Sequence, residues 1–364
     1  MKTLRLDDEG QSVLVLQKLL KKAGLTPSDH GKVDAATDEA IKSFQQKESL
    51  GVDGIAGPNT WKRLLTKHYS FGLGAKNQFL ESNEFMSEIF EKNTIYIHHT
   101  AGSGKADGVI QWWEKDNETY GVDRYRVGTA FVIGRTLLGG SEKYDGKTWR
   151  AFKEYYWCNH LGLGKRHTGK GKTHNKMLEK QSIGIEICSY GHLTKEGSKF
   201  YFIIKDSSGK IVVKREIPAD QVCTLDKPWR GHSHFHKYTE KQIAETKRII
   251  LLLSYLFDIN IPDTSYDASW FDIKQDALDG KPGLWTHCNV RPDKTDCFPQ
   301  PELIEMLNGL HEAAKSYAPT DQELETLRTR GLGPGFPSSK LTAEDELIYS
   351  MSDLEDAREE RNNS

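Results

Sequence analysis

Three short segments of the sequence carry side chains that could hold a metal ion or move a proton. The first, residues 94–100, contains two isoleucines and two adjacent histidines, and an extended strand would point Ile95 and Ile97 to one face and His98 to the other. A histidine at a strand end can also be a structural residue that only makes hydrogen bonds. This segment alone therefore leaves both interpretations of His98 open.

The second segment, residues 182–188, alternates in the same way. Ile183, Ile185 and Ile187 would form one buried face, which leaves Glu186 in the middle of the other face. Burying a carboxylate is costly unless it is paired, hydrated or close to a metal. The pattern thus indicates either a buried ion pair or a functional carboxylate.

The third segment, residues 283–299, offers His287 and then Lys294 and Asp296 on an expected loop. A histidine and a carboxylate about nine residues apart can close a metal site together with a distant histidine. Two histidines, one carboxylate and a water molecule form a catalytic zinc arrangement. The spacing by itself does not settle the ligand set.

The elements that position these segments alternate between strand and helix, so residues 94–315 predict an α/β domain. We expect strands over 94–99, 130–134, 182–188 and 200–205. A long helix is expected over about 240–257, and a final helix follows Pro301. Residues 67–93 are expected to form a linker and one amphipathic helix that includes Phe79, Phe85 and Ile89.

The two ends of the chain differ from this central domain. Residues 1–66 predict a small all-α unit of three short helices, with the turn signal Asp53-Gly54 before the third. Residues 316–364 carry 5 basic and 11 acidic side chains and are expected to form a polar, acidic C-terminal tail. The sequence therefore predicts two domains and a tail.

The N-terminal unit resembles the peptidoglycan-binding type 1 domain. The resemblance rests on Leu4-Arg5, Gly10, Val13, Leu16-Gln17, Leu20, Gly24, Thr37, Ala40-Ile41, Phe44-Gln45, Leu50, Val52-Asp53-Gly54, Gly57-Pro58, Thr60-Trp61 and Leu64. Where the family usually has Asp-Gly-x-Phe-Gly, this chain has His30-Gly31-Lys32-Val33-Asp34. The resemblance implies binding to the bacterial cell wall. A helical bundle that docks another protein is the alternative.

The second domain resembles the zinc N-acetylmuramoyl-L-alanine amidases (amidase type 2), which are related to peptidoglycan recognition proteins and phage endolysins. The stretches that carry the resemblance occur in family order and are 97–101 (Ile-His-His-Thr-Ala), 129–135, 157–162, 181–186 (Gln-Ser-Ile-Gly-Ile-Glu) and 286–299. The family fold implies a central mixed β-sheet flanked by helices.

Residue by residue, the resemblance implies one catalytic Zn²⁺ held by His98, His287 and Asp296. It also implies Glu186 as general acid and base, and Lys294 as a positive group near the reacting oxygen. The activity would be hydrolysis of the amide between N-acetylmuramic acid and L-alanine by zinc-activated water.

Three further residues follow from the same comparison. His160 and Thr129 are expected to border the substrate, and Thr129 stands where some relatives have a tyrosine. Some relatives use a cysteine as third ligand in a Lys-x-Cys pattern; here Lys294-x-Asp296 occupies that pattern and Cys297 comes one residue late, which leaves Cys297 as the alternative ligand. Two other functions stay open: a non-catalytic peptidoglycan-binding sensor, and a zinc peptidase that acts on the stem or cross-bridge peptide.

Composition limits the partners. The chain of 364 residues has 50 basic and 52 acidic side chains, a balance that disfavours a nucleic-acid binder. No stretch approaches the roughly 20 apolar residues of a membrane span, and five scattered cysteines argue against a disulfide framework.

The first nine residues lack the apolar core of a signal peptide. We therefore expect cytoplasmic synthesis, followed by action on peptidoglycan, both glycan strand and stem peptide, after release or delivery. The oligomeric state, and the choice among endolysin, injected effector and autolysin, stay open.

Overall fold

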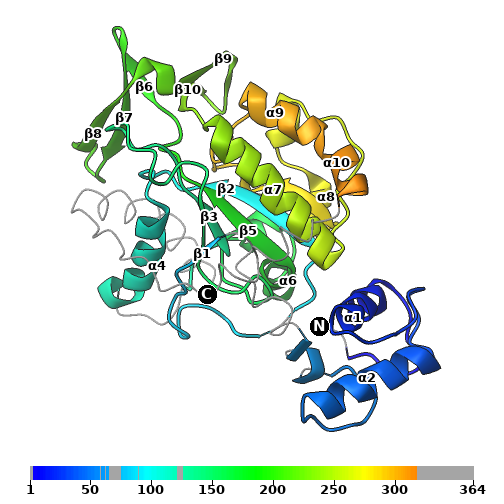
Figure 1. The fold of residues 1–364 in the computed structure, drawn as a ribbon. Coiled ribbons are helices and arrows are strands. Elements are labelled where there is room, and N and C mark those ends of the chain that lie inside the picture. Colours follow the sequence, from blue (N-terminus) through cyan, green and yellow to red (C-terminus); the bar gives the residue numbers. More distant parts are fainter. Residues whose placement is uncertain are drawn as a thin grey trace.

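A computed structural model describes residues 3–57, 59–61, 63–64, 75–88, 90–120 and 126–317 of the chain. Within these ranges an N-terminal helical part precedes a mixed α/β part (Figure 1). The tail predicted over 316–364 lies outside the described residues from position 318 onward.

The N-terminal part contains α1 (Gln11–Lys22) and α2 (Ala35–Lys47), and residues 59–61 and 63–64 are also helical. Their apolar faces meet in a core that includes Leu16, Phe44 and Trp61. The turn predicted at Asp53-Gly54 is fixed from α2, because the Gln45 amide oxygen accepts hydrogen bonds from both main-chain nitrogens at 3.1 and 3.0 Å. Pro58, Lys62 and Leu65, which belong to the segment predicted as the third helix, lie outside the described residues.

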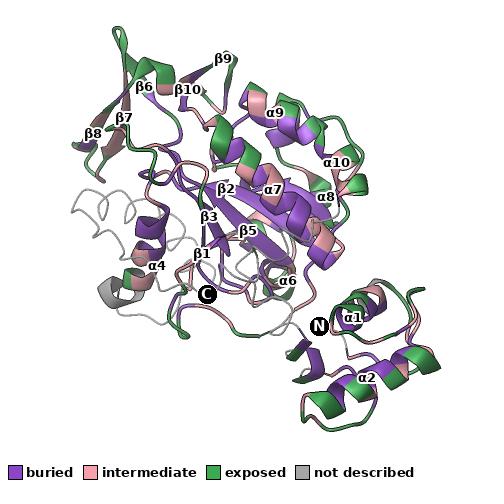
Figure 2. Ribbon diagram, viewed as in Figure 1, coloured by how far each residue is buried: buried purple, intermediate pink, exposed green. Residues whose placement is uncertain are grey.

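A six-stranded mixed sheet forms the centre of the α/β part, in the order β1-β4-β3-β5-β2-β11. Strands β3, β5, β2 and β11 are mutually parallel, whereas β4 runs antiparallel to β3. The strand bounds are β1 (Lys76–Asn77), β2 (Thr94–His99), β3 (Phe131–Ile133), β4 (Thr148–Arg150), β5 (Ser182–Ile187) and β11 (Gly283–Thr286). Every residue of β2 and β5 is buried, as Figure 2 shows, so both faces of these strands are covered.

Helices pack on this sheet. The long helix α7 (Glu240–Phe257) lies against β3 and β5 and is covered by α9 (Pro301–Asn308) and α10 (Leu310–Ser316), while α4 (Ala106–Tyr120) packs on β3 and β4. A capping box at Thr239 and Gln242 begins α7. Shorter elements are α5 (Lys165–Thr168), α6 (Lys172–Gln181), α8 (Gln275–Leu278), η1 (Ala219–Gln221), η2 (Ala268–Phe271) and η3 (His287–Asn289).

An insertion between β5 and α7 forms two smaller sheets. Strands β6 (Thr194–Glu196), β7 (Lys199–Lys205) and β8 (Ile211–Ile217) have a core of their own around Phe202 and Ile217. Strands β9 (Val222–Trp229) and β10 (His232–His236) form an antiparallel pair. The sequence predicted a strand within β7 but not its partners: β6 is a short, fully exposed strand, and β8 alternates between exposed and buried residues.

The amphipathic helix predicted within 67–93 is wrong for the described residues 75–88 and 90–93, which contain strand β1 and turns. This segment is held by hydrogen bonds to other parts of the chain, such as Leu80 N to Ala151 O at 2.8 Å and Met86 N to Trp157 O at 2.9 Å. Its aromatic residue Phe85 lies in a bend and stacks on Phe152 and Tyr156. Ile89, the third apolar residue of that prediction, lies outside the described residues.

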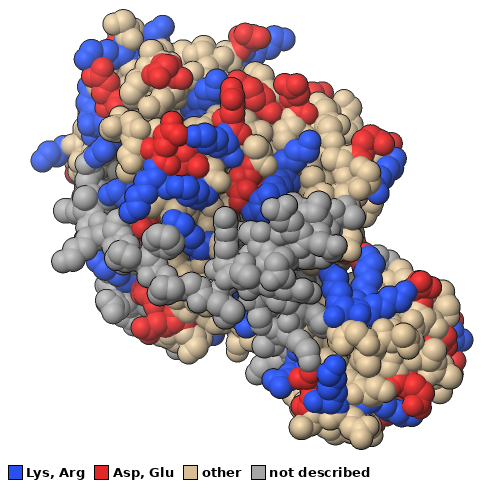
Figure 3. All heavy atoms as spheres, viewed as in Figure 1, with Lys and Arg blue, Asp and Glu red and all other residues tan. Residues whose placement is uncertain are grey.

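Surface charge, helix character and the cysteines complete the description of the fold. Acidic and basic side chains are interspersed over the described part of the face drawn in Figure 3. None of the helices in the described ranges has the length and apolar character needed to cross a membrane. All five cysteines are buried and free.

Candidate metal centre

Three adjacent parallel strands bring His98, Glu186 and His287 to one edge of the sheet. His98 and Glu186 are register partners on β2 and β5, so their side chains leave the same face of the sheet. On the other side of β2, Thr286 of β11 pairs with Ile97, and His287 follows it. Carboxyl ends of parallel strands are the usual place for a site in an open α/β sheet.

A local hydrogen-bond arrangement fixes the turn that carries His287. The main-chain nitrogen of Thr286 donates to the Asn289 side-chain oxygen at 2.7 Å. The Asn289 amide nitrogen in turn donates to the carbonyl oxygen of Asp272 at 2.9 Å. The chain therefore leaves β11 and enters η3 with a defined geometry.

Asp296 closes the group from the loop after η3. Its Oδ2 lies 3.2 Å from His287 Nδ1 and 3.5 Å from His98 Nδ1. One ligand atom from each of the three residues can be chosen so that all lie within 4.8 Å of one another, and all three side chains are buried. Such a group can bind a metal ion, and its donors suit zinc.

The protonation of these groups favours a cation between them. Burial lowers the pKa of His98 to about 4, so this imidazole is neutral at pH 7. Burial opposes ionisation of Asp296, whereas positive charge on His287 or His98, when these imidazoles are protonated, would hold its pKa well below the ordinary value. Asp296 Oδ1 is buried and has no hydrogen-bond partner. An ionised, buried carboxylate with an unpartnered oxygen is costly unless a cation faces it.

A chain of hydrogen bonds orients the imidazole of His98. The Ser182 hydroxyl donates to the Glu179 main-chain oxygen at 3.0 Å, so Ser182 Oγ accepts from His160 Nε2, which lies 2.7 Å away. His160 Nδ1 is then an acceptor and faces His98 Nε2 at 2.9 Å. His98 Nε2 must carry the proton, which leaves the lone pair of Nδ1 directed toward Asp296.

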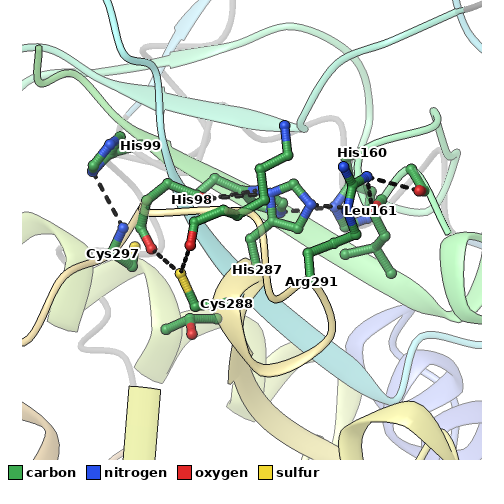
Figure 4. A network of polar contacts seen from close by, with 12 residues as sticks. His98, His99, His160, Leu161, His287, Cys288, Arg291 and Cys297 are labelled. Carbon is green, nitrogen blue, oxygen red and sulfur yellow. Dashed lines mark hydrogen bonds and ion pairs between the residues drawn. The ribbon is translucent and has the colours of Figure 1, made fainter. Parts of the chain in front are cut away.

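His287 is oriented in the same sense. Its Nε2 lies 3.1 Å from the carbonyl oxygen of Leu161, which can only accept, so Nε2 carries the proton and Nδ1 faces Asp296. Figure 4 shows His98 and His287 beside their outer partners His160 and Leu161. Two nitrogen lone pairs and a carboxylate that converge repel one another without a cation, so the arrangement fits a divalent metal.

The two predicted reacting residues lie near this group. Glu186 is 8% exposed and lies beside His98 across the β2–β5 ladder. Lys294 is partly exposed on the loop of Asp296, and its charge contributes to lowering the pKa of His98. Both positions are compatible with the predicted roles, which remain predictions.

The residues predicted to border the substrate have structural contacts. Thr129 is 2% exposed, and its hydroxyl donates to the Phe131 carbonyl oxygen at 3.0 Å. A Cβ at Gly184 would lie 2.7 Å from Thr129 Cγ2 and 3.2 Å from His160 Nδ1. Thr129 thus packs against Gly184 in β5, the strand that carries Glu186, and the His160 imidazole contacts His98 Nε2. Whether either residue touches substrate remains a prediction.

The alternative ligand Cys297 does not join the metal-binding group found among the described residues. Its main-chain nitrogen donates to His99 Nδ1 at 3.2 Å, and its side chain is buried. His99 also contacts the Tyr238 hydroxyl at 2.7 Å. These contacts place Cys297 beside His99, whereas the side chain of Asp296 faces His98 and His287.

Sequence reasoning missed the residues that hold the Asp296 loop. Arg230, at the turn between β9 and β10, donates to the carbonyl oxygens of Arg291 at 2.8 Å and Cys288 at 2.9 Å, and it also contacts that of Lys294. Cys288 Sγ donates to the Asp296 carbonyl oxygen at 2.7 Å. An arginine in a polar hairpin gives no sequence signal of this role, because the partners are main-chain atoms.

Comparison with known proteins identifies the N-terminal part. Residues 9–64 match the family described as putative peptidoglycan binding domain. This match agrees with the resemblance drawn from the sequence and indicates binding to the cell wall.

Among solved structures, the Burkholderia AP3 phage endolysin is 44% identical over 17% of this chain and 24% of its own, with a TM-score of 0.17. A periplasmic domain of the EpsAB fusion protein of the Vibrio vulnificus type II secretion system is 36% identical over 17% of this chain and 29% of its own, with the same TM-score of 0.17. The chain thus spans about a quarter of the length of these two proteins. The structure of PlyL is 12% identical over 70% of this chain and 96% of its own, with a TM-score of 0.31.

Proposed function

We propose that this protein is a peptidoglycan hydrolase that cleaves the amide bond between N-acetylmuramic acid and L-alanine, a wall-lytic enzyme of the phage endolysin type. The observation that carries the proposal is the buried group of His98, His287 and Asp296, with an unpartnered carboxylate oxygen in its midst. The peptidoglycan-binding match at residues 9–64 supports a wall substrate and would raise the local concentration of the enzyme there.

The metal would be zinc, held by the two histidines and Asp296. When bound, zinc supplies a Lewis acid that lowers the pKa of water from 15.7 toward about 7 and polarises a carbonyl group. The protein contributes the orientation of both imidazoles, through His160 and the Leu161 carbonyl, and a buried environment for the ligands.

Glu186 would carry the proton. Its carboxylate accepts a proton from the attacking water as the oxygen–carbon bond forms, and it returns that proton to the nitrogen of L-alanine as the carbon–nitrogen bond breaks. The products are the lactyl carboxylate of the muramic acid and a stem peptide with a free amino terminus. Proton transfer of this kind is typically worth about 10²–10⁴-fold in rate.

Lys294 would face the negative oxygen that develops on the scissile carbonyl. It lies two residues before Asp296 on a loop that Arg230 holds at the main-chain oxygens of Cys288, Arg291, Pro292 and Lys294 itself. A positive group fixed near a developing oxyanion stabilises the transition state by about 3 kcal/mol in comparable cases.

Mass spectrometry of digested sacculi tests the proposal. Purified sacculi are incubated with the zinc-loaded protein, with the chelated protein and with Glu186→Gln, and Glu305→Gln on the exposed side of α9 serves as the matched control. We expect free stem peptides that begin with L-alanine from the wild type and the control only. Cleavage within the stem or cross-bridge would identify a peptidase instead, and binding without any product would identify a sensor.

A further inference from the structure

We propose that Glu179 is a positioning residue of the metal centre, because its carboxylate holds the short backbone segment that supplies the outer hydrogen-bond partners of both histidine ligands. The inference rests on the proposed zinc site and adds to it a residue that contacts neither metal nor substrate. No sequence motif singled out Glu179, which lies near the end of the polar helix α6.

The Glu179 carboxylate accepts hydrogen bonds from three successive main-chain nitrogens. His160 N lies 2.9 Å from Oε2, Leu161 N lies 3.1 Å from Oε1, and Gly162 N lies 3.2 Å from Oε1. The side chain is 4% exposed, and Gly162 adopts a positive φ of 56° that helps its nitrogen turn toward the same carboxylate. A carboxylate that accepts hydrogen bonds from several main-chain N–H groups fixes their geometry, because hydrogen bonds to a charged acceptor are stronger than those to a neutral one.

The segment that Glu179 holds reaches both ligands. The His160 imidazole contacts His98 Nε2 at 2.9 Å, and the Leu161 carbonyl oxygen lies 3.1 Å from His287 Nε2. These contacts decide which nitrogen of each histidine carries the proton, and hence which nitrogen is free to bind a metal. One carboxylate therefore governs the orientation of two ligands, His98 on β2 and His287 at the start of η3.

The end of α6 that carries Glu179 is itself held by a buried lysine. Lys92 is buried, and its Nζ donates to the main-chain oxygens of Lys180 at 2.8 Å and Ser182 at 2.9 Å. The Ser182 hydroxyl completes the chain to His160. Glu179, Ser182 and the 160–162 backbone thus form one connected support behind the ligands.

Glu179→Gln isolates the charge with little change in volume. Its amide nitrogen is a donor, so it cannot replace a carboxylate oxygen that accepts main-chain N–H groups. We expect the zinc affinity to fall by about 10- to 100-fold, the usual effect of losing a partner of the ligands. Glu88 is exposed and forms an ion pair with Lys180, the residue next to Glu179. The control variant Glu88→Gln also removes one carboxylate charge, and it should leave the zinc affinity unchanged.

Zinc affinity is measured at equilibrium by competition with a chromophoric chelator, on the full chain, together with the absorption spectrum of the Co²⁺-loaded protein. A double-mutant cycle with His160→Ala separates positioning from general loosening. If Glu179 acts through the 160–162 segment, the double variant loses less affinity than the product of the two single losses. Glu179→Asp, which keeps the charge, should bind zinc more tightly than Glu179→Gln and covers the case in which Glu179→Gln does not fold.

The outcomes separate this inference from the proposed function. Wild-type zinc affinity and an unchanged Co²⁺ spectrum in Glu179→Gln overturn the inference and leave the amidase proposal standing, as does a cycle whose losses multiply. A wild type that binds zinc but releases no stem peptide overturns the amidase proposal alone. A wild type that binds no zinc overturns both.

Discussion

Zinc should stabilise the folded protein through Asp296. In the metal-free protein this carboxylate is buried, with one oxygen unpartnered and the other facing two imidazole nitrogens. Leaving a buried polar group unsatisfied costs about 1–3 kcal/mol, and more for a charged group. A cation that binds only the folded state removes this penalty and shifts the unfolding equilibrium by mass action.

The size of the shift follows from the zinc concentration. At 100 times the dissociation constant, a ligand of the folded state adds about 2.7 kcal/mol to the free energy of unfolding. For a domain of this size, 1 kcal/mol corresponds to about 2–4 °C. We therefore expect the melting temperature of the α/β domain to rise by roughly 5–11 °C between the chelated and the zinc-loaded protein.

Differential scanning calorimetry provides the measurement. Asp296→Asn removes the charge at the centre and should abolish most of the zinc-dependent rise. Asp263→Asn, whose side chain is 84% exposed, should keep the full rise. Zinc does not stabilise the fold through Asp296 if it leaves the wild-type melting temperature unchanged, or if Asp296→Asn responds to zinc as the wild type does.

Three further predictions concern proton transfer, acid stability and the loop. Glu186→Gln should bind zinc as the wild type does while the rate of stem-peptide release falls by about 10²–10⁴-fold, and parallel metal analysis and product assays would contradict the assigned role if activity persists. Burial lowers the folded-state pKa of both His98 and His99 from 6.5 to about 4, so the unfolded state takes up protons first as the pH falls. The free energy of unfolding of the metal-free protein should therefore decrease from about pH 6.5 to pH 4. Denaturant titrations across that range measure this pH dependence, which should be weaker in His99→Gln. Arg230→Met should lower the free energy of unfolding by about 1.5–3 kcal/mol, because main-chain oxygens lose a charged donor, and a melt equal to that of the exposed Lys227→Met would contradict the contacts described here.

The sequence predicted the buried strands of the site well because their patterns are local. Alternating isoleucines set the face of Glu186, and the run around His98 gave β2 with its observed bounds. Helix α7 was also predicted with its observed bounds, since its apolar spacing is a local signal. Parallel pairing then brings His98, Glu186 and His287 to one edge.

The parts that escaped prediction depend on contacts between distant residues. Phe79, Phe85 and Ile89 predict an amphipathic helix, yet Phe85 lies in a bend and stacks on Phe152 and Tyr156, far along the chain. Glu179 and Arg230 act on main-chain atoms of other loops, and such partners leave no pattern in side-chain types. The contact between His160 and His98 likewise joins residues 62 positions apart.

Crystallography of the zinc-loaded protein, with anomalous data at the zinc absorption edge, locates the metal directly. We expect one strong peak between His98, His287 and Asp296, about 2.0–2.2 Å from Nδ1 of each histidine and from a carboxylate oxygen. A fully loaded protein whose peak lies elsewhere, or whose ligands include Cys297 in place of Asp296, would contradict this ligand set.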